Sequence, residues 1–522
     1  MKKFRIGFII HQDKKVPAWY AETIKEMLSK GHTIFLLLTR LPLKKKGSII
    51  YELFNRFEKT WFRHEHNSQQ DVHLQFAAPV QSIPVSGFLV NNDDTVRLRA
   101  VDLDLIYSIN YEGGEETIST LAKFGLWYVR FGTGTFENAK PPAFWEVMEN
   151  SPVTGSRLLM RREGISYILY DGTTRTIPHS VKNNLDAVSW KAASYLGHRL
   201  NTLSGRYEEF FQIFPTYSTG NTRHHSPGNR EMVKLFFKNV SAYLVYKKHL
   251  RNAVDKFSVL YSFEPVRKGF IPSSFESLEM PPGYFYADPF IIKKEGSFFL
   301  FFESFDDLKD KAHIAMVQNN GKQWSEPVVV LEKDYHLSYP FVFEKDGAYY
   351  MIPETAANHT VELYRAVSFP GRWEFVMNLF EGTTLIDATV YYCNGRWWLF
   401  ANSNNHPFAS TNDQLLLFYS DELLSPSWIP HPLNPIATHA GNCRPAGRIF
   451  EKNGKLYRPA QDNASQQYGY GLKINEIEVL NEKEYIEKEV ESMSPEVFNL
   501  KAIHHLDWKD SLTVIDGIKG NT

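Results

Sequence analysis

The sequence predicts an α/β domain followed by an all-β five-bladed propeller. The α/β prediction comes from alternating apolar strands and helical patterns near the N-terminus, and the propeller from a motif repeated four times in the C-terminal half. The length of 522 residues also favours two or three domains. We expect domains at 1–215 and 256–522, joined by a linker and amphipathic helix at 216–255.

The N-terminal elements are typical of a parallel α/β sheet. A helical pattern covers about Trp19 to Lys30, and Gly31 stands where a C-cap residue belongs. Continuous apolar strands around such a helix predict a parallel sheet. No Gly-rich fingerprint follows the first strand, which disfavours a dinucleotide site. The expected strands are 4–10, 33–38, 105–108 and 126–129.

The repeated motif consists of a short apolar strand, a turn that ends in Gly, and an aromatic strand. In all four copies the turn Gly follows an anchor residue by eight positions. The anchors are residues 288, 339, 387 and 446, spaced by 51, 48 and 59 residues. Periods near 50 with two hairpin strands per unit indicate propeller blades. We expect the fifth blade to be shared by 257–261 and 504–516, because joining the first and last strands closes the ring.

The region from Phe124 to Gly172 resembles the folate-dependent formyltransferase domain. The matching segments are 125–129 (GLWYV), 141–147 (PPAFWEV) and 152–156 (PVTGS), and the resemblance extends over roughly residues 1–200. It implies an Asn, a His and an Asp as catalytic residues, but Tyr128, Arg130 and Ser166 stand at those places. Arginine cannot shuttle a proton near pH 7.

We therefore expect the formyltransferase-like domain of residues 1–215 to be catalytically degenerate, without tetrahydrofolate as a cofactor. Arg130 could instead hold an anionic group. Equally, it could be a surface arginine or one that covers the core.

The C-terminal repeats resemble two related groups of five-bladed propellers. The segment 286–290 (YADPF) is similar to the first-blade motif of inverting arabinofuranosidases and xylosidases, which are glycoside hydrolase family 43-like. A longer resemblance links the propeller to the N-terminal domain of plant glucosamine inositolphosphorylceramide transferase and its bacterial relatives. In that family the transferase activity is attributed to a different domain. The segments that carry it are 287–290 (ADPF), 336–343 (HLSYPFVF), 351–355 (MIPET), 444–450 (RPAGRIF) and 457–462 (YRPAQD).

The predicted catalytic residues are Asp288, Asp387 and Glu354. The hydrolase resemblance implies that Asp288 is a general base and that Asp387 tunes a general acid. Two carboxyl groups that face one cavity suit acid–base chemistry, and inverting glycosidases hold theirs about 6.5–9.5 Å apart. No Glu-Gly-Pro-like acid is found, so Glu354 is its best substitute. Asp288 could instead cap a turn, and Glu354 could accept a hydrogen bond from the backbone of the next blade.

The predicted ligand-binding residues combine arginines with polar and aromatic groups. Guanidinium groups recognise phosphate or carboxylate in two-point contacts, so we expect an acidic sugar or a sugar that carries phosphate. The alternative is an Arg–Asp network that joins blades, and a lone His is more often structural. The expected residues are His336, Tyr339, Arg444, Arg448, Arg458, Gln461 and Asp462.

The bulk composition excludes several classes of protein. A net charge of −1 predicts no general attraction to nucleic acid. Two cysteines, Cys393 and Cys443, show no metal-ligand spacing and argue against a disulfide-stapled secreted protein. Neither a signal peptide nor a transmembrane run is recognisable, so we expect a reduced, cytoplasmic protein without a metal. The basic helix at 232–251 could contact a membrane surface, or it could pack between the domains.

These observations favour a carbohydrate-active transferase of surface-polysaccharide or glycan biosynthesis, with its sugar site in the propeller funnel. Its partner would be a sugar, a sugar nucleotide or a glycan precursor. One alternative is a non-catalytic glycan-binding or scaffold protein, because the formyltransferase residues are missing. A second is an inverting glycoside hydrolase. Fold resemblance alone does not decide among them.

Overall fold

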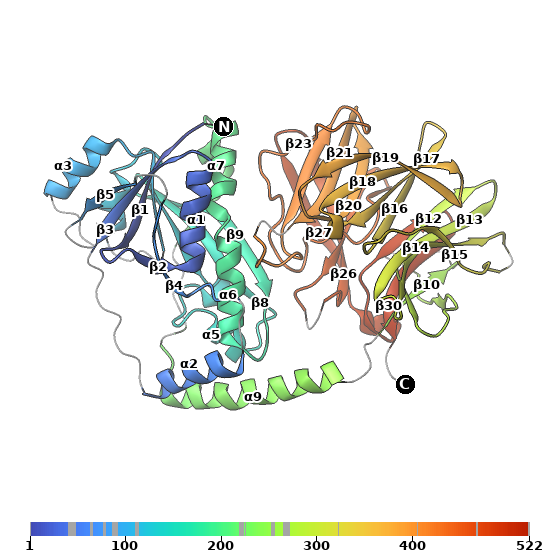
Figure 1. Cartoon of the computed structure of the whole chain (residues 1–522), viewed down its shortest axis with the longest axis horizontal. Helices are drawn as coiled ribbons and strands as arrows, with labels where there is room; N and C mark the ends of the chain where they lie inside the picture. Colours follow the sequence, from blue (N-terminus) through green and yellow to red (C-terminus); the bar gives the residue numbers. More distant parts are fainter. Residues whose placement is uncertain are drawn as a thin grey trace. The chain divides into compact units, whose positions relative to one another are not determined.

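The computed structural model divides into two compact units (Figure 1). Unit 1 comprises Met1–Arg251 with Asn405–Ser410, and unit 2 comprises Asn252–Asn404 with Thr411–Thr522. Much of the predicted linker, at 219–223 and 225, lies outside the described residues. The structure describes residues 2–39, 49–62, 66–76, 80–85, 92–109, 114–218, 224, 226–251, 256–264, 272–321, 323–403, 406–465 and 468–519.

Unit 1 is built on a seven-stranded sheet in the order β5-β3-β1-β6-β7-β8-β9. The first five strands are parallel, whereas β8 and β9 are antiparallel to their neighbours, so the predicted parallel sheet is in fact mixed. The strands β8 and β9 form a hairpin whose turn residues, Glu163 and Gly164, both have positive φ, as a tight two-residue turn requires. The strands are β1 (Arg5–His11), β3 (Thr33–Thr39), β5 (Gln81–Pro84), β6 (Leu105–Ile109), β7 (Leu126–Phe131), β8 (Val153–Arg162) and β9 (Ile165–Arg175).

Helices cover both faces of this sheet. One face packs on α1 (Ala18–Ser29), α6 (Val181–Ala192) and α7 (Tyr195–Gly205), and the other on α3 (Asn92–Val101) and α4 (Glu115–Ser119). The α/β character predicted for the N-terminal region is thus present. The remaining elements of unit 1 are β2 (Lys15–Pro17), β4 (Asp71–His73), α2 (Ile49–Trp61), η1 (Gly134–Phe136), α5 (Phe144–Met148), α8 (Phe210–Ile213) and α9 (Asn229–Arg251).

Unit 2 is a five-bladed β-propeller, as the repeats predict. Each of the first four blades is a four-stranded antiparallel sheet. Blade one contains β12 (Tyr284–Lys294), β13 (Ser297–Asp306), β14 (Lys311–Asn319) and β15 (Val328–Leu331), and blade two contains β16 (Ser338–Lys345), β17 (Ala348–Thr355), β18 (Thr360–Ser368) and β19 (Arg372–Glu381). Blade three contains β20 (Leu385–Cys393), β21 (Arg396–Ser403), β22 (Leu415–Ser420) and β23 (Ile429–Pro430), and blade four contains β24 (Phe450–Lys452), β25 (Lys455–Asp462), β26 (Gly471–Leu480) and β27 (Tyr485–Met493). Short 3-10 turns lie at η2 (Ala356–Asn358) and η3 (Pro495–Phe498).

The fifth blade is split between distant segments, which confirms the predicted closure. Strand β10 (Phe257–Ser262) pairs with β30 (Leu512–Lys519), and β30 also pairs with β28 (Leu500–Ala502) and β29 (Leu506–Lys509). The outermost strand is β11 (Glu276–Ser277). The start and the end of the propeller therefore share one sheet, and no edge is left at the closure.

Two kinds of glycine explain the repeated motif. The turn glycines of the first four blades follow an Asp, Asn or Glu that also has positive φ, as type I′ hairpins require. Gly447 is different, because its φ of 125° suits only glycine and a Cβ there would lie 1.9 Å from the carbonyl oxygen of Leu506. Blades four and five can meet at this point only because residue 447 has no side chain.

We expect Gly447→Ala to destabilise the propeller far more than Gly454→Ala in the same blade. Gly454 has a φ of 73° and open space around its Cβ position, so its substitution should cost about 1–2 kcal/mol of unfolding free energy. Gly447→Ala adds a backbone clash and should cost about 4 kcal/mol or more. Chemical denaturation of both variants measures the difference, and equal losses would contradict the close approach.

Candidate functional site

Three inner strands of the propeller begin with a bulge at their anchor residue. The pairing of β12 with β13, of β16 with β17 and of β20 with β21 shifts register at the same point of each strand. There Asp288, Tyr339 and Asp387 have φ values of 51°, 42° and 53°. Positive φ is uncommon outside glycine and costs on the order of 1–3 kcal/mol. Pro289 and Pro340 follow two of the anchors, and a bulge is a position where a strand tolerates Pro.

The bulges turn three anchor N–H groups away from their ladders, and carboxylates accept them. The N–H of Asp288 donates to Oδ2 of Asp516 over 2.9 Å. The N–H of Tyr339 donates to Oδ2 of Asp288, and that of Asp387 to Oε2 of Glu354, each over 3.3 Å. A buried backbone donor needs a partner, so these carboxylates connect blade five to one, one to two, and two to three.

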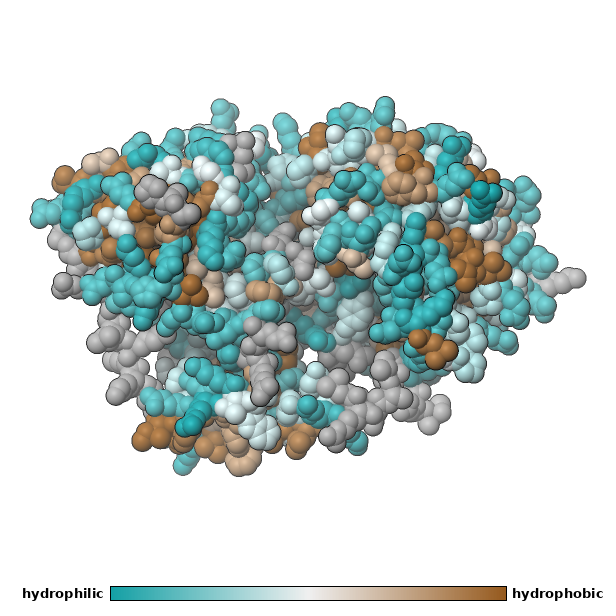
Figure 2. Space-filling view, viewed as in Figure 1, coloured by the Kyte–Doolittle hydropathy of each residue, from teal (hydrophilic) through white to brown (hydrophobic). Residues whose placement is uncertain are grey.

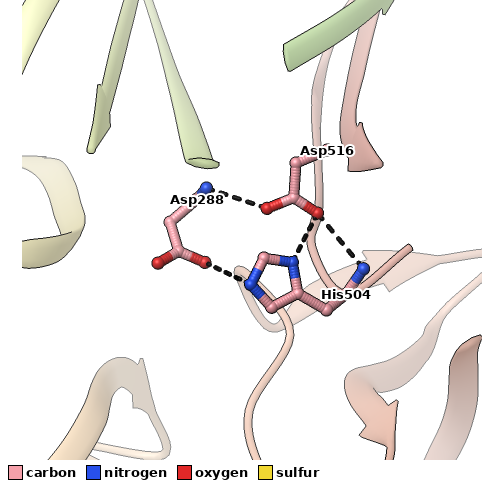
Figure 3. A group of neighbouring side chains, drawn as sticks. All are labelled: Asp288, His504 and Asp516. Carbon is pink, nitrogen blue, oxygen red and sulfur yellow. Dashed lines mark hydrogen bonds and ion pairs between the residues drawn. The ribbon is translucent and has the colours of Figure 1, made fainter. Parts of the chain in front are cut away.

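Asp288, His504 and Asp516 form a buried cluster where blades five and one meet (Figure 3). Oδ1 of Asp516 accepts hydrogen bonds from Nδ1 of His504 over 2.7 Å and from the backbone N–H groups of His504 and His505. Nε2 of His504 lies 3.8 Å from Oδ1 of Asp288, and Nδ1 of His505 lies 3.5 Å from the same oxygen.

Two opposed pKa shifts follow from this cluster. Burial raises the pKa of Asp288, but His505, His504 and Arg444 outweigh it and lower the pKa to about 2. Burial lowers the pKa of His504, but the charge of Asp516 outweighs it and raises the pKa to about 9. At neutral pH, Asp288 is therefore negatively charged, and His504 is positively charged with a proton on both ring nitrogens.

The same three residues also have the side-chain types of a metal site. They offer donor atoms that lie within 4.8 Å of one another, which is close enough for one ion. However, both oxygens of Asp516 already accept N–H groups, and Nδ1 of His504 donates to one of them. A metal ligand must be an unprotonated imidazole. The donor set therefore fits a hydrogen-bonded relay better than a metal centre.

Asp387 and Arg444 form a buried ion pair between blades three and four. Nε and Nη2 of Arg444 lie 2.6 and 3.3 Å from the two Asp387 oxygens, while Nη1 donates to Oδ1 of Asn412 over 2.9 Å. Oε2 of Glu354 lies 3.9 Å from Nη2. Burial, and then the charge of Asp387, raise the pKa of Glu354 well above its usual value in spite of Arg444. Gln461 donates to Asp387 over 3.4 Å.

The more exposed edge of this region carries His336 and Tyr468. The side chain of His336 is 39% exposed, and its Nε2 lies 3.4 Å from Oε1 of Glu303. Burial raises the pKa of Glu303. Burial alone would lower the pKa of His336, but the hydrogen bond to Glu303 outweighs burial, so the pKa of His336 is raised. The ring centroid of Tyr468 lies 5.2 Å from the guanidinium carbon of Arg444. We call Asp288, Glu303, His336, Glu354, Asp387, Arg444 and His504 the axial cluster.

Tyr339 and Arg448 lie at the propeller axis, where each contacts more than one other blade. Tyr339 is fully buried, and its hydroxyl contacts Thr389 of blade three and the backbone of Gly447 in blade four. Arg448 pairs with Asp507 of blade five over 3.2 Å and donates to the carbonyl oxygen of residue 342 in blade two. The expectation that Tyr339 contacts a ligand is corrected, and Arg448 joins blades as the alternative interpretation states.

Two further expected ligand-binding residues have structural roles. Arg458 is 1% exposed and forms a two-point ion pair with Glu487 of β27, so it stabilises blade four from inside. Asp462 accepts hydrogen bonds from the backbone N–H groups of Ala464 and Ser465 and thereby caps a turn. The expectation for both residues is corrected, because Arg458 is buried against Glu487 and the carboxylate of Asp462 caps a turn.

The N-terminal candidates do not form one site. Tyr128 and Arg130 are both buried on β7, and the guanidinium carbon of Arg130 lies 5.0 Å from the Tyr128 ring. Ser166 lies on β9, where its hydroxyl accepts from Arg161, the residue that pairs with Leu126 at the opposite end of β7 from Arg130. Placing Ser166 with the other two residues is therefore wrong.

Sequence reasoning missed Glu303, His504, Asp516, Asn412 and Tyr468. Glu303 could have been found from the repeat, because one polar residue follows each of the first four anchors by fifteen positions: Glu303, Glu354, Asn402 and Gln461. These residues lie near the ends of the second strands, at the same level as the bulges. His504 could not be found by this counting, because the fifth blade has Ser511 at the position where the other blades have the turn glycine.

Fold and site together define a five-bladed propeller with a buried acidic and basic cluster on its axis, preceded by an α/β unit. The family model "Glucosamine inositolphosphorylceramide transferase 1, N-terminal" matches residues 234–512, more than half of the chain. The chain belongs to this family, as its motifs predict. The match begins at residue 234, so the formyltransferase resemblance of the N-terminal region stays a prediction.

Curated relatives support the same assignment. Glucosamine inositolphosphorylceramide transferase 1 of Arabidopsis thaliana is 35% identical over 213 residues, covering 40% of this chain and 28% of the plant protein. Its Oryza sativa subsp. japonica counterpart is 35% identical over 236 residues, covering 43% and 31%. The matched region thus spans less than a third of either relative.

Solved structures with some similarity include glycoside hydrolases. The catalytic domain of a GH62 α-L-arabinofuranosidase from Coprinopsis cinerea has 11% identity and a TM-score of 0.36, covering 45% of this chain and 85% of that one. A GH43 protein from Bacillus licheniformis has 17% identity and a TM-score of 0.30, covering 41% and 44%. Similarities of this size do not bear on function.

The raised pKa of His504 predicts a loss of stability at alkaline pH. Its folded value of about 9 exceeds the unfolded value of 6.5, so the stabilisation is complete below 6.5 and is lost as the pH rises through 9. The unfolding free energy should fall by up to about 1.4 kcal/mol per pH unit in this window. His504→Asn should remove that slope, whereas the exposed His359→Asn should keep it. Denaturant titrations at several pH values measure the slope, and identical slopes in both variants would refute the assignment.

Proposed function

We propose that this protein is a carbohydrate-active transferase of surface-polysaccharide or glycan biosynthesis whose sugar site lies at the axial cluster. The observation that carries the proposal is the convergence of carboxyl groups on Arg444, which lies 2.6 Å from Asp387 and 3.9 Å from Glu354. The pKa of Glu354 is raised well above its usual value and that of Asp288 is lowered to about 2. Carboxyl groups with pKa values pushed apart are the usual basis of acid–base assignments in active sites.

Each group then has a defined chemical role. The raised pKa favours the protonated form of Glu354, which can donate its proton to the oxygen that leaves when a glycosidic or sugar–phosphate bond breaks. Asp288 stays ionised, and its negative charge can stabilise positive charge that develops at the sugar carbon. Asp288 and Arg444 both influence the pKa of Glu354, and Arg444 also lowers that of Asp288, so the three groups lie in one region of the axis.

Arg444 supports a donor that carries phosphate. Asp387 and Asn412 use three of its N–H groups, and a guanidinium has five. Among the described residues, the other two have no hydrogen-bond partner within normal distance. Tyr468, partly exposed beside Arg444, offers a ring face to a sugar. The relatives' name includes both glucosamine and inositolphosphorylceramide, which is consistent with a sugar and a phosphate-bearing acceptor.

Two other functions keep specific support. A non-catalytic glycan-binding or scaffold role is favoured by the ion pairs of Arg444, Arg448 and Arg458, each of which joins strands or blades. An inverting hydrolase is favoured by the presence of paired carboxyl groups alone. We propose a cytoplasmic location with peripheral membrane contact through residues 232–251. Among the described residues, no helix is long and apolar enough to span a membrane.

Glu354→Gln tests the acid role with little structural cost. The amide oxygen can still accept the N–H of Asp387, but the side chain can no longer release a proton. Transfer of radiolabelled sugar from uridine or guanosine diphosphate sugars to a lipid-linked phosphate acceptor should fall by about 10²–10⁴-fold, with donor binding retained. The exposed Glu344→Gln in the same blade is the matched control.

Product analysis separates the alternatives. Labelled acceptor in the wild type supports the transferase, whereas free labelled sugar as the sole product replaces it with the hydrolase. Binding of a donor or a glycan, without turnover for any pair of donor and acceptor, favours the non-catalytic glycan-binding or scaffold role. Equal transfer by wild type and Glu354→Gln would remove Glu354 from the mechanism.

Arg444→Lys tests donor recognition. Lysine keeps the positive charge beside Asp387 but loses the planar fork. The dissociation constant of a phosphate-bearing donor should rise about tenfold or more, while affinity for the neutral sugar should change little. Calorimetric titration of both ligands measures the ratio, and an equal change for both ligands would show that Arg444 does not contact the phosphate.

A further inference from the structure

Helices α2 and α9 of unit 1 present an exposed apolar surface that the axial cluster does not use. The two helices pack side by side, with the rings of Phe57 and Phe236 centred 4.6 Å apart (Figure 1). Figure 2 shows hydrophobic side chains gathered over both helices along the lower edge of the view. We call this the α2–α9 surface, and its exposed apolar residues are Ile49, Leu53, Trp61, Val233, Phe237, Leu244, Val245 and Tyr246.

Five of these side chains form stripes with helical periodicity. On α9, Phe237 and Leu244 follow Val233 by four and eleven positions, so all three lie on one stripe. On α2, Leu53 follows Ile49 by four positions and lies beside it, whereas Trp61, twelve positions on, lies about 120° around the helix. Ile49 is 78% exposed and Phe237 is 66% exposed. Large apolar side chains exposed in a continuous surface mark a binding site in soluble proteins.

The opposite faces of the helices are firmly held, so the exposed stripes are not the result of loose packing. Phe54 of α2 and Leu235 of α9 are buried in one core cluster with α5. Beside them, the buried carboxylate of Glu58 accepts hydrogen bonds from the Ser180 hydroxyl over 2.7 Å and from the amide of Asn239 over 2.8 Å. This carboxylate therefore connects α2, α9 and the start of α6, and it fixes which face of each helix is exposed.

The charge around the surface is positive, although the whole chain has a net charge of −1. Among the described side chains, α9 carries five basic residues and one acidic residue. Lys238 donates to the carbonyl oxygen of Met148 over 3.0 Å and is used inside unit 1. Arg230, Lys234, Lys247 and Lys248 are exposed. Apolar stripes flanked by lysines match a bilayer, whose acyl region takes the apolar groups and whose anionic headgroups take the cations.

We propose that the α2–α9 surface docks unit 1 onto a bilayer that contains anionic lipid. The two helices lie in the interface, with Leu53, Phe237 and Leu244 inserted beneath the headgroups and Lys247 and Lys248 against phosphate. This inference deepens the membrane contact named in the proposed function, and its test requires no turnover. Failure of lipid binding and failure of sugar transfer are therefore distinguishable.

The test is flotation of the full chain with vesicles of phosphatidylcholine alone or with added phosphatidylglycerol, at low and physiological salt. The wild type should float with the anionic vesicles, and less so at higher salt. Phe237→Glu/Leu244→Glu should lower the bound fraction about tenfold or more. Lys247→Glu/Lys248→Glu should weaken binding to anionic vesicles by about tenfold or more.

Val96→Glu is the matched control, since Val96 is equally apolar, 70% exposed and located on α3 of the same unit. It should float like the wild type, and all variants should show the thermal midpoint of the wild type. Absence of wild-type flotation, or flotation of the Phe237→Glu/Leu244→Glu variant like the wild type, overturns the proposal. A concentration-dependent dimer that this variant abolishes, with vesicle binding unchanged, also overturns it and assigns the surface to a second copy of the chain.

Discussion

The propeller depends on a chain of hydrogen bonds from bulged anchor amides to carboxylates of the preceding blade. The backbone of Asp288, Tyr339 and Asp387 leaves its own ladder, and Asp516, Asp288 and Glu354 accept the freed N–H groups. Each bulge therefore needs an acid next to the axis, and each acid fixes the rotation between two blades. Tyr339, Gly447 and Arg448 can fill the axis only when these rotations are correct.

This arrangement also accounts for the electrostatics of the axial cluster. Carboxyl groups needed as acceptors are brought close to one another and to Arg444 and His504, so the pKa of Glu354 is raised and that of Asp288 is lowered. Arg444 and His504 supply the balancing charge. The carboxyl groups that hold the blades together are thus the same groups for which we propose a chemical role. For Asp288, a structural role and an acid–base role do not exclude one another.

The propeller could be predicted from the sequence because its blades repeat in fixed register. Anchor spacing located Asp288 and Asp387, and Glu354 was chosen at the end of the second strand of blade two as a substitute for the missing acid. The same counting applied to the second strands reaches Glu303. The partners of Arg458 and Asp462 could not be predicted, since Glu487 lies on a strand outside the repeated motif and a turn-capping Asp has no distinctive pattern. Asp516 could not be predicted either, because the split fifth blade does not show the repeated motif. In unit 1, resemblance suggested residues but not their distances, and Ser166 was misplaced.

The split fifth blade constrains the order in which the protein can form during synthesis. Strand β10 is made before any complete blade, yet its partner β30 is made more than two hundred residues later. Until then β10 keeps an unpaired edge, which is a liability for misassociation. Four blades can close locally, but the ring must wait for the most distant pairing, a slow step by contact order. The strand that seals the propeller is also the strand that carries Asp516, so the axial cluster is completed last.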